Sequence, residues 1–251
     1  MLTRRALLSS GLATFALACS REAKKSAAPS WPRQTSREGV DFIELFPHGA
    51  TEESPILVAI HGRGDRPENW VDTYRSFPHA ARIVLPRAFT PFGSGFSWFD
   101  LHDGMSDEEL GAAVGAAETR LWKGTVALTG AKKIFVTGFS QGGILSFAIA
   151  SRHADAVAYA FPVAGSCPGP LLPKAGAPIA PLVAFHGTAD PVIEFRWGRA
   201  AVDTFKERGG DARLRAYPGV AHSMTAEMHA DLESEITAAM TGASRSPARD
   251  K

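Results

Sequence analysis

The chain has 251 residues, of which 45% are hydrophobic and 21% charged, so it is neither wholly disordered nor collagen-like nor a coiled coil, and one compact domain is expected. The chain has 27 lysines and arginines against 26 aspartates and glutamates, and it has no long basic run. It therefore lacks the basic surface that binding of nucleic acid requires, and nucleic acid is not expected as a partner. Two cysteines, Cys19 and Cys167, cannot make a disulfide framework, and neither has a cysteine or histidine neighbour at zinc-ligand spacing.

The first 18 residues have the layout of a secretory signal peptide. Arg4 and Arg5 precede an apolar stretch over residues 7–18 that is too short to cross a bilayer. The arginine pair also resembles the twin-arginine export motif, which predicts an exported bacterial protein, either periplasmic or anchored to a membrane. Phe15–Cys19 is similar to a lipoprotein box, so lipidation of Cys19 and plain cleavage of the signal are both open.

Residues 19–37 are polar, contain Pro29 and Pro32, and show no apolar period. This composition predicts a flexible tether. The folded domain is expected over residues 38–241, and the polar residues 242–251 are expected to form a disordered tail.

Within the expected domain, short apolar runs alternate with longer stretches of helical period. Strands are predicted at residues 42–46, 55–61, 82–86, 133–139, 157–163, 181–185 and 214–217. Helices are predicted at residues 107–128, 144–152, 195–208 and 224–240. This alternation predicts an α/β fold with an open, mostly parallel sheet and helices on both faces, in which ligands bind beyond the carboxyl ends of the strands.

The most specific motif is Gly-Phe-Ser-Gln-Gly at residues 138–142, between a predicted strand and a predicted helix. A serine at such a turn takes a strained backbone conformation, and small residues two places before and after it avoid clashes. Both flanking elements are predicted here. Ser140 is therefore expected to be a nucleophile rather than a serine that only caps a helix.

A serine hydroxyl becomes a good nucleophile when a base takes its proton and an acid orients the base. Asp190 lies in the loop after one predicted strand, and His222 lies in the turn between the last strand and the last helix. The order Ser140, Asp190, His222 is the order of the α/β-hydrolase triad. The rival pair His102 and Asp103 precedes the serine and breaks that order.

Acyl transfer also needs backbone donors for the oxygen that becomes negatively charged. The amide of Gln141, directly after the nucleophile, is expected to be one of them. The amide of Arg63, in the His-Gly-Arg-Gly-Asp turn at residues 61–65, is expected to be the other. His61 and His186 are expected to brace their loops by hydrogen bonding.

The connection over residues 89–103 carries four large apolar side chains, Phe92, Phe96, Trp98 and Phe99. They are expected to form a wall of the substrate pocket. The equally weighted alternative is that Trp98 and Phe99 anchor this connection on the core. No inserted helical segment of lipase-lid size is present, which favours small or soluble esters over fat droplets.

Taken together, these stretches resemble the phospholipase/carboxylesterase family of α/β-hydrolases, the small serine esterases similar to acyl-protein thioesterases. The resembling stretches are IHGRGD, LPRAFTPFGSGFSWFDL, VTGFSQGGILSFAIA, PVAGS, FHGTADPVI and GVAHSM, in the family's order over residues 56–230. The resemblance implies the α/β-hydrolase fold and a carboxylesterase that needs no metal or organic cofactor. It implies Ser140 as nucleophile, Asp190 as acid and His222 as base, with the amides of Arg63 and Gln141 as the oxyanion hole.

Two features depart from the family pattern. Arg63 stands where the family usually has an apolar residue, and an arginine at the rim of the site would favour an acidic or polar acyl group. The family is typically cytosolic, whereas this chain carries an export signal. A lysophospholipase or an extracellular polyester or aryl-ester hydrolase of the same fold is therefore one alternative, and a non-catalytic surface lipoprotein that uses the fold as a binding module is another.

Overall fold

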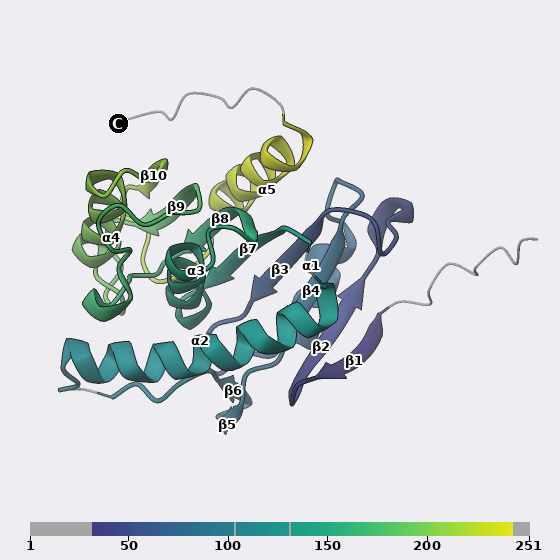
Figure 1. Ribbon diagram of the computed structural model, residues 1–251, viewed down its shortest axis with the longest axis horizontal. Helices are drawn as coiled ribbons and strands as arrows, with labels where there is room; N and C mark the ends of the chain where they lie inside the picture. Colours follow the sequence, from purple (N-terminus) through teal and green to yellow (C-terminus); the bar gives the residue numbers. More distant parts are fainter. Residues whose placement is uncertain (1–31, 103, 131, 243–251) are drawn as a thin grey trace, which may run out of the picture.

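The computed structural model describes residues 32–102, 104–130 and 132–242 (Figure 1). One sheet of eight strands has the order β1-β2-β4-β3-β7-β8-β9-β10, and β5 (Thr90–Phe92) and β6 (Gly95–Ser97) form a separate hairpin. Its strands are β1 (Arg33–Arg37), β2 (Val40–Leu45), β3 (Ile56–Ile60), β4 (Arg82–Pro86), β7 (Ile134–Phe139), β8 (Val157–Val163), β9 (Leu182–Gly187) and β10 (Ala212–Tyr217). From β4 to β10 all neighbouring strands pair in parallel, whereas β1 and β2 run antiparallel to their neighbours. The predicted open, mostly parallel sheet is confirmed.

Helices cover both faces of this sheet, as predicted. They are α1 (Val71–Arg75), α2 (Asp107–Thr129), α3 (Gln141–Arg152), α4 (Phe195–Glu207) and α5 (Ala226–Thr241), with short 3₁₀ turns at Pro47–Gly49, Pro67–Trp70 and Gly169–Leu171. The longest, α2, begins with a capping box in which the Ser106 hydroxyl accepts from the amide of Glu109 and the Glu109 carboxylate accepts from the amide of Ser106. The helix therefore starts where its sequence predicts.

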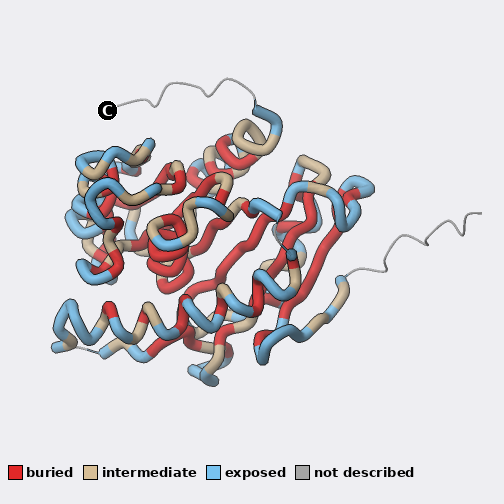
Figure 2. Tube along the Cα trace, viewed as in Figure 1, coloured by how far each residue is buried: buried red, intermediate tan, exposed pale blue. Residues whose placement is uncertain are grey.

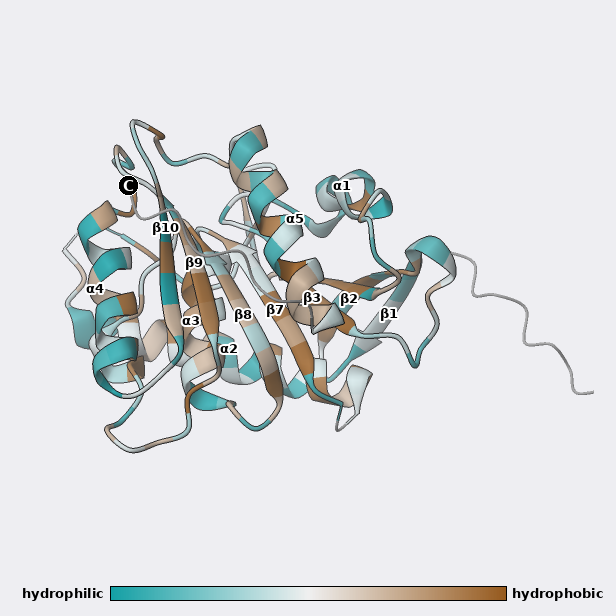
Figure 3. Ribbon diagram, turned by 90° about the horizontal axis from the view of Figure 1, so that it is seen from above, coloured by the Kyte–Doolittle hydropathy of each residue, from teal (hydrophilic) through white to brown (hydrophobic). Residues whose placement is uncertain are grey.

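The core has two layers, one on each face of the sheet. Ile56, Val58 and Ile60 of β3 pack in one layer, together with residues of α2, α3 and α4. The alternate residues Leu57 and Ala59 pack in the other layer, with residues of α1 and α5. All five residues of β3 are buried, and the strands at the centre of the molecule form its apolar interior (Figures 2 and 3). The continuous apolar run in the sequence reflects this burial on both faces.

The predicted tether over residues 19–37 is wrong at its C-terminal end. Residues 33–37 form β1, which pairs with β2 at the edge of the sheet, so the folded domain begins before residue 38. Arg33 binds Glu44 of β2 and Glu52, which holds the strand in place by ion pairs rather than by apolar packing. The remainder of the predicted tether, the predicted signal peptide with Cys19, and residues 243–251 of the predicted tail lie outside the described residues.

The predicted loop over residues 89–103 contains two short strands that the sequence does not predict. Strands β5 (Thr90–Phe92) and β6 (Gly95–Ser97) pair as an antiparallel hairpin. Three-residue strands are too short to show an alternating pattern. This hairpin lies against the turn after β3, close to the carboxyl edge of the sheet.

The parallel arrangement brings four important loops to one edge. The turns after β3, β7, β9 and β10 all leave the carboxyl ends of parallel strands. They contain, in this order, Arg63, Ser140, Asp190 and His222. Within the described residues, no helix combines the length and apolar character needed to cross a membrane.

Candidate active site

Ser140 lies in a sharp turn between β7 and α3. Its backbone has φ 58° and ψ −116°, a conformation that is costly for a residue with a side chain. Gly138 and Gly142 make the turn possible because a Cβ at Gly138 would lie 2.4 Å from the Gly142 carbonyl oxygen, and one at Gly142 would lie 2.0 Å from that of Ile60. The serine is thus held at the start of α3 by the glycine spacing noted in the sequence.

The structure brings Ser140, His222 and Asp190 into one hydrogen-bonded chain. The Nε2 atom of His222 lies 2.9 Å from the Oγ atom of Ser140, and its Nδ1 atom lies 2.7 Å from Oδ2 of Asp190. Because a carboxylate only accepts, Nδ1 donates to Asp190 and the free Nε2 accepts from the serine hydroxyl. This is the arrangement in which a histidine takes a proton from a serine. Asp103, of the rival pair, lies outside the described residues.

The carboxylate of Asp190 is buried and held by its own loop. Its Oδ1 atom accepts from the amides of Val192, at 2.8 Å, and Ile193, at 2.9 Å. His186 closes the loop, with its Nε2 atom 2.8 Å from the carbonyl oxygen of Ile193. Burial lowers the pKa of His186, so this ring is neutral and donates to that carbonyl. His186 braces the acid loop, in the manner expected from the sequence.

The turn after β3 packs directly against the nucleophile. A Cβ at Gly62 would lie 3.4 Å from the Cβ of Ser140, so the chain passes the serine at close range. Neither the amide of Arg63 nor that of Gln141 has a hydrogen-bond acceptor within the described part of the chain. Two free backbone donors on either side of a serine are suited to hold a developing oxyanion.

His61 fixes the peptide that carries the first of these donors. Its Nδ1 atom donates to the carbonyl oxygen of Gly62, at 2.7 Å, and its Nε2 atom accepts from the amide of Ala88, at 3.2 Å. Burial lowers the pKa of His61, which keeps the ring neutral in this tautomer. Because the Gly62 carbonyl and the Arg63 amide belong to the same planar peptide, holding one orients the other.

The β5–β6 hairpin is attached to the same turn. The amide of Gly64 donates to the carbonyl oxygen of Phe96, at 2.8 Å, and the amide of Phe96 donates to that of Asp65, at 2.9 Å. Phe96 itself is only half-buried. Just beyond the hairpin, the indole of Trp98 donates to the carbonyl oxygen of His61, at 2.8 Å. The turn with the Arg63 amide is therefore supported by a segment more than 30 residues away in sequence.

The side chain of Gln141 connects the second donor to this same segment. Its Oε1 atom accepts from the amide of Trp98, at 3.0 Å, and from the Ser97 hydroxyl, at 3.2 Å, while its Nε2 atom donates to the carbonyl oxygen of Phe99, at 2.9 Å. The side chain is fully buried. The sequence predicts a role only for the backbone amide of Gln141, because the partners of its side chain become apparent only when the fold brings residues 97–99 beside α3.

The large apolar residues predicted as a pocket wall lie in different environments. Trp98 and Phe99 are 2% and 6% exposed and belong to the buried core, which is the alternative role left open above. Phe92 is 46% exposed, and the Arg63 guanidinium lies over its ring at 4.6 Å. The same guanidinium donates to the carbonyl oxygen of Leu101. The Arg63 side chain therefore contacts the hairpin segment.

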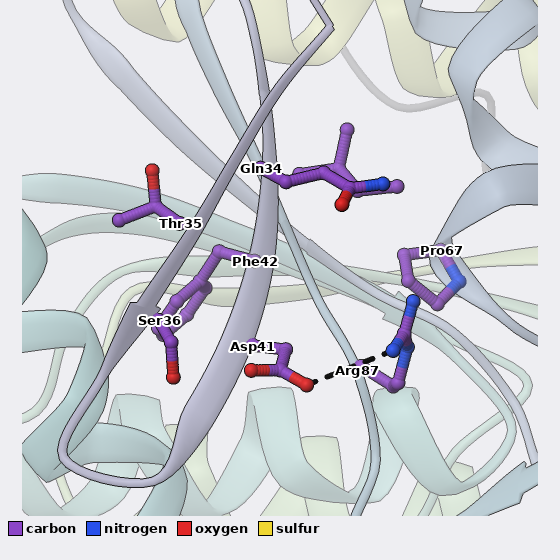
Figure 4. Close-up of a pocket in the computed structure, with 8 residues that line it drawn as sticks. Gln34, Thr35, Ser36, Asp41, Phe42, Pro67 and Arg87 are labelled. Carbon is purple, nitrogen blue, oxygen red and sulfur yellow. Dashed lines mark ion pairs between the residues drawn. The ribbon is translucent and has the colours of Figure 1, made fainter.

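Two cavities differ in whether a residue of the chain Asp190–His222–Ser140 lines them. One of about 280 Å³ lies at the β1–β2 edge, where Asp41 and Arg87 form an ion pair (Figure 4), and no member of the serine chain lines it. Another of about 430 Å³ includes His222 in its wall. Its lining residues are Asp65, Asn69, Trp70, Thr73, Tyr74, Phe139, His222, Ser223, Met224, His229 and Leu232.

The described residues contain neither a cluster of metal ligands nor an activated thiol. No group of three or more histidine, cysteine, aspartate or glutamate side chains in that part of the chain could hold an ion. Burial raises the pKa of the Cys167 thiol, which keeps it protonated and unreactive. The hydrogen-bonded chain from Asp190 through His222 to Ser140, by contrast, is an arrangement suited to acyl transfer by a serine.

Known proteins that are similar to this chain include esterases and thioesterases. The model of a family described as Phospholipase/Carboxylesterase matches residues 46–240. A probable carboxylesterase of Oryza sativa subsp. japonica is 31% identical over 207 residues, which cover 76% of this chain and 75% of that protein. An acyl-protein thioesterase 1 of Cryptococcus neoformans is 27% identical over 221 residues, covering 73% and 92% of the two chains. The crystal structure of esterase PE8 shares the fold, with a TM-score of 0.65, 20% identity, and coverage of 77% and 96%.

Proposed function

The chain belongs to the phospholipase/carboxylesterase family of α/β-hydrolases and is an ester-hydrolysing enzyme, and from this premise we propose that it is a serine carboxylesterase that acts on small or soluble esters. One observation carries the proposal. It is the continuous hydrogen-bonded chain from Asp190 through His222 to Ser140, beside two backbone amides without acceptors in the described residues.

The proposed reaction has two steps. The Oγ atom of Ser140 bonds to the ester carbonyl carbon while its proton moves to Nε2 of His222, and the amides of Arg63 and Gln141 hold the oxyanion. The bond between the carbonyl carbon and the alkoxy oxygen then breaks, and His222 gives the proton to the leaving alcohol. Water, activated by the same histidine, releases the acid from Ser140. Asp190 stabilises the imidazolium formed in each step.

The connections at the carboxyl edge support the choice of small or soluble esters. Between β4 and α2 the described chain forms the short β5–β6 hairpin, and it contains no helical insertion of the kind that covers a lipase site. The family description also includes phospholipases, so a lysophospholipase is the alternative that the test must separate.

The test is hydrolysis of nitrophenyl esters from acetyl to palmitoyl by the purified protein and by its Ser140→Ala variant. We expect activity that is highest with short acyl groups and that falls by on the order of 10⁴-fold or more in the variant, because the nucleophile is lost. An optimum at long acyl chains would favour the lysophospholipase. Equal activity of the two folded proteins would refute the serine mechanism.

We further propose that the protein is exported, and that residues 1–18 are its signal peptide, with Cys19 as the residue at which a lipid anchor would be attached. These residues lie outside the described part of the chain, and the proposal rests on their sequence alone. In a bacterial host, mass spectrometry of the mature N-terminus and fractionation of a Cys19→Ala variant test it. A periplasmic variant and a membrane-bound parent indicate lipidation, whereas an intact N-terminus in the cytoplasm contradicts export.

A further inference from the structure

The cavity beside His222 contains none of the groups that attack the ester carbonyl or hold its oxyanion. Its volume of about 430 Å³ lies in the range of small-molecule sites. It lies between the turn that leads into α1, on one side, and the loop after β10 with α5, on the other. Both α1 and α5 cover the same face of the sheet (Figure 3).

The walls of this cavity are largely aromatic and apolar. The rings of Trp70 and Tyr74 stack with centroids 5.9 Å apart and planes at 20°. Phe139, Met224 and Leu232 complete the apolar lining. A flat, uncharged ring is the kind of group that such walls bind through area burial and stacking.

The charges around the cavity disfavour an anion. The carboxylate of Asp65 is in the wall, with Oδ2 accepting from the indole of Trp70, at 2.7 Å, and Oδ1 accepting from the side chain of Asn69, at 2.6 Å. The lining residues all belong to the described part of the chain, and none of them is lysine or arginine. A ligand carboxylate or phosphate would therefore meet the negative charge of Asp65 without a lysine or arginine to offset it.

The mechanism indicates which part of an ester reaches this cavity. The carbonyl carbon must lie at Ser140 and the carbonyl oxygen at the amides of Arg63 and Gln141, and none of these three residues lines the cavity. His222 does line it, and the alkoxy oxygen is the ester atom that takes the proton from Nε2. Phe139, whose ring centroid lies 4.9 Å from that of His222, continues the wall away from the imidazole.

We propose that this cavity is the subsite for the alcohol part of the ester, and that the alcohol it accepts is uncharged and aromatic, from benzyl to naphthylmethyl in size. The inference rests on the proposed function, since it assigns one side of the same reaction centre. The alcohol leaves in the first step, with the proton from Ser140 that His222 delivers. All esters of one acid then give the same acyl-enzyme, so the subsite affects kcat/KM for acylation and not the rate of deacylation.

The experiment compares methyl, benzyl and 2-naphthylmethyl butyrate with an acyl series of methyl esters from acetate to octanoate. Thr73→Trp fills the cavity from an exposed position of α1. Thr119→Trp, at an exposed position of α2 on the other face of the sheet, is the matched control. Circular dichroism establishes that each variant is folded.

We expect wild type to prefer the benzyl over the methyl ester by at least tenfold in kcat/KM, and Thr73→Trp to lose most of that ratio while Thr119→Trp keeps it. Benzyl butyrate with a carboxylate on its ring should lose the preference in wild type. An unchanged benzyl-to-methyl ratio of kcat/KM in folded Thr73→Trp would overturn the assignment. A Thr73→Trp protein that keeps this ratio but prefers a different acyl length among the methyl esters would overturn it too. If the protein hydrolyses nitrophenyl acetate through Ser140 and yet shows no alcohol preference, the subsite fails and the proposed function stands.

A measurement on the wild-type protein tests the same subsite without any variant. An alcohol that fits it should also attack the acyl-enzyme, because that step is the reverse of acylation. With methyl butyrate as acyl donor, we expect benzyl alcohol to capture the butyryl group at least tenfold better than ethanol at equal concentration. Equal capture by the two alcohols would contradict the proposal.

Discussion

At the residue scale, the turn at Ser140 was predictable because the glycines that its backbone conformation requires can be seen in the sequence. A serine with φ 58° needs glycines where a Cβ would meet backbone, and Gly138 and Gly142 provide them two places on either side. The role of the Gln141 side chain was not predictable. Its partners at residues 97–99 lie more than 40 positions away, and a glutamine after a nucleophile gives no local signal of where its amide points.

The buried side chain of Gln141 leads to a prediction about catalysis. Gln141→Met keeps the volume but removes the bonds to residues 97–99, so we expect the amide at this position to be less well aligned with the oxyanion. Losing one oxyanion donor costs about 10²–10³ in kcat, and a misaligned donor should cost part of that, about tenfold to a hundredfold, with KM little changed. Steady-state kinetics with nitrophenyl acetate measure both constants.

Ser97→Ala is the control for Gln141→Met, because it removes the 3.2 Å bond from the Ser97 hydroxyl to Gln141, together with the 2.8 Å bond from that hydroxyl to the Phe99 carbonyl oxygen. It leaves the other two bonds of the Gln141 side chain in place. It should lower kcat by a smaller factor than the methionine variant. A Gln141→Met protein that melts at a lower temperature but has the kcat of wild type would show that the side chain only stabilises the fold.

At the element scale, the predictable strands are those buried on both faces. Every residue of β3 and of β4 is buried. In the sequence β3 is an uninterrupted apolar run, and β4 is apolar after Arg82, its first residue. Strand β1 lies at the sheet edge and has a mostly polar sequence, RQTSR, so hydrophobic periodicity could not show it. Its position depends on pairing with β2 and on the ion pairs of Arg33, which are long-range contacts that no window of sequence contains.

The same limit applied to the connection between β4 and α2. Its aromatic residues were noticed, but their separation into a buried pair, Trp98 and Phe99, and an exposed Phe92 follows from how the hairpin folds onto the turn after β3. Gly95 shows how close that contact is, because a Cβ there would lie 2.3 Å from the carbonyl oxygen of Asp65. The sequence did not reveal elements whose position depends on contacts with another loop rather than on a hydrophobic period of their own.

At the scale of the whole molecule, the candidate active site and a buried ion pair lie at opposite ends of the parallel strands. The carboxyl ends carry the serine chain, whereas the amino end of β4 carries a buried ion pair. Arg82, the first residue of β4, lies 2.5 Å from the Glu44 carboxylate, and Arg33 of β1 binds the same carboxylate at 2.9 Å. Glu44 is completely buried. A substitution in the cluster of Arg33, Glu44 and Arg82 should therefore affect stability without altering the geometry around Ser140.

Burial by itself would raise the pKa of Glu44, but hydrogen bonds from Arg33 and Arg82 outweigh it and hold the pKa below the ordinary value of 4.5. A carboxyl whose pKa is lowered on folding stabilises the protein above its unfolded pKa, and that contribution is lost as the pH falls through the folded pKa. We therefore expect Glu44→Gln to lower the free energy of unfolding at pH 7 by about 3 kcal/mol, because it leaves Arg82 buried without its anionic partner. The difference from wild type should begin to shrink once the pH falls below about 4.3, the ordinary pKa of an unfolded glutamate, and should go on shrinking as the pH falls through the lower pKa of the native carboxyl.

Urea unfolding of both proteins between pH 3 and pH 8 measures this difference. Glu53→Gln is the matched control, because its ion pair with Lys132 is exposed and should contribute only about 0–1 kcal/mol. In the folded state, Glu44→Gln should keep the kcat/KM of wild type, since its cluster lies at the opposite ends of the strands from Ser140. A loss of stability of the same size at pH 3 and pH 7 would assign the effect to packing rather than to the charge of Glu44.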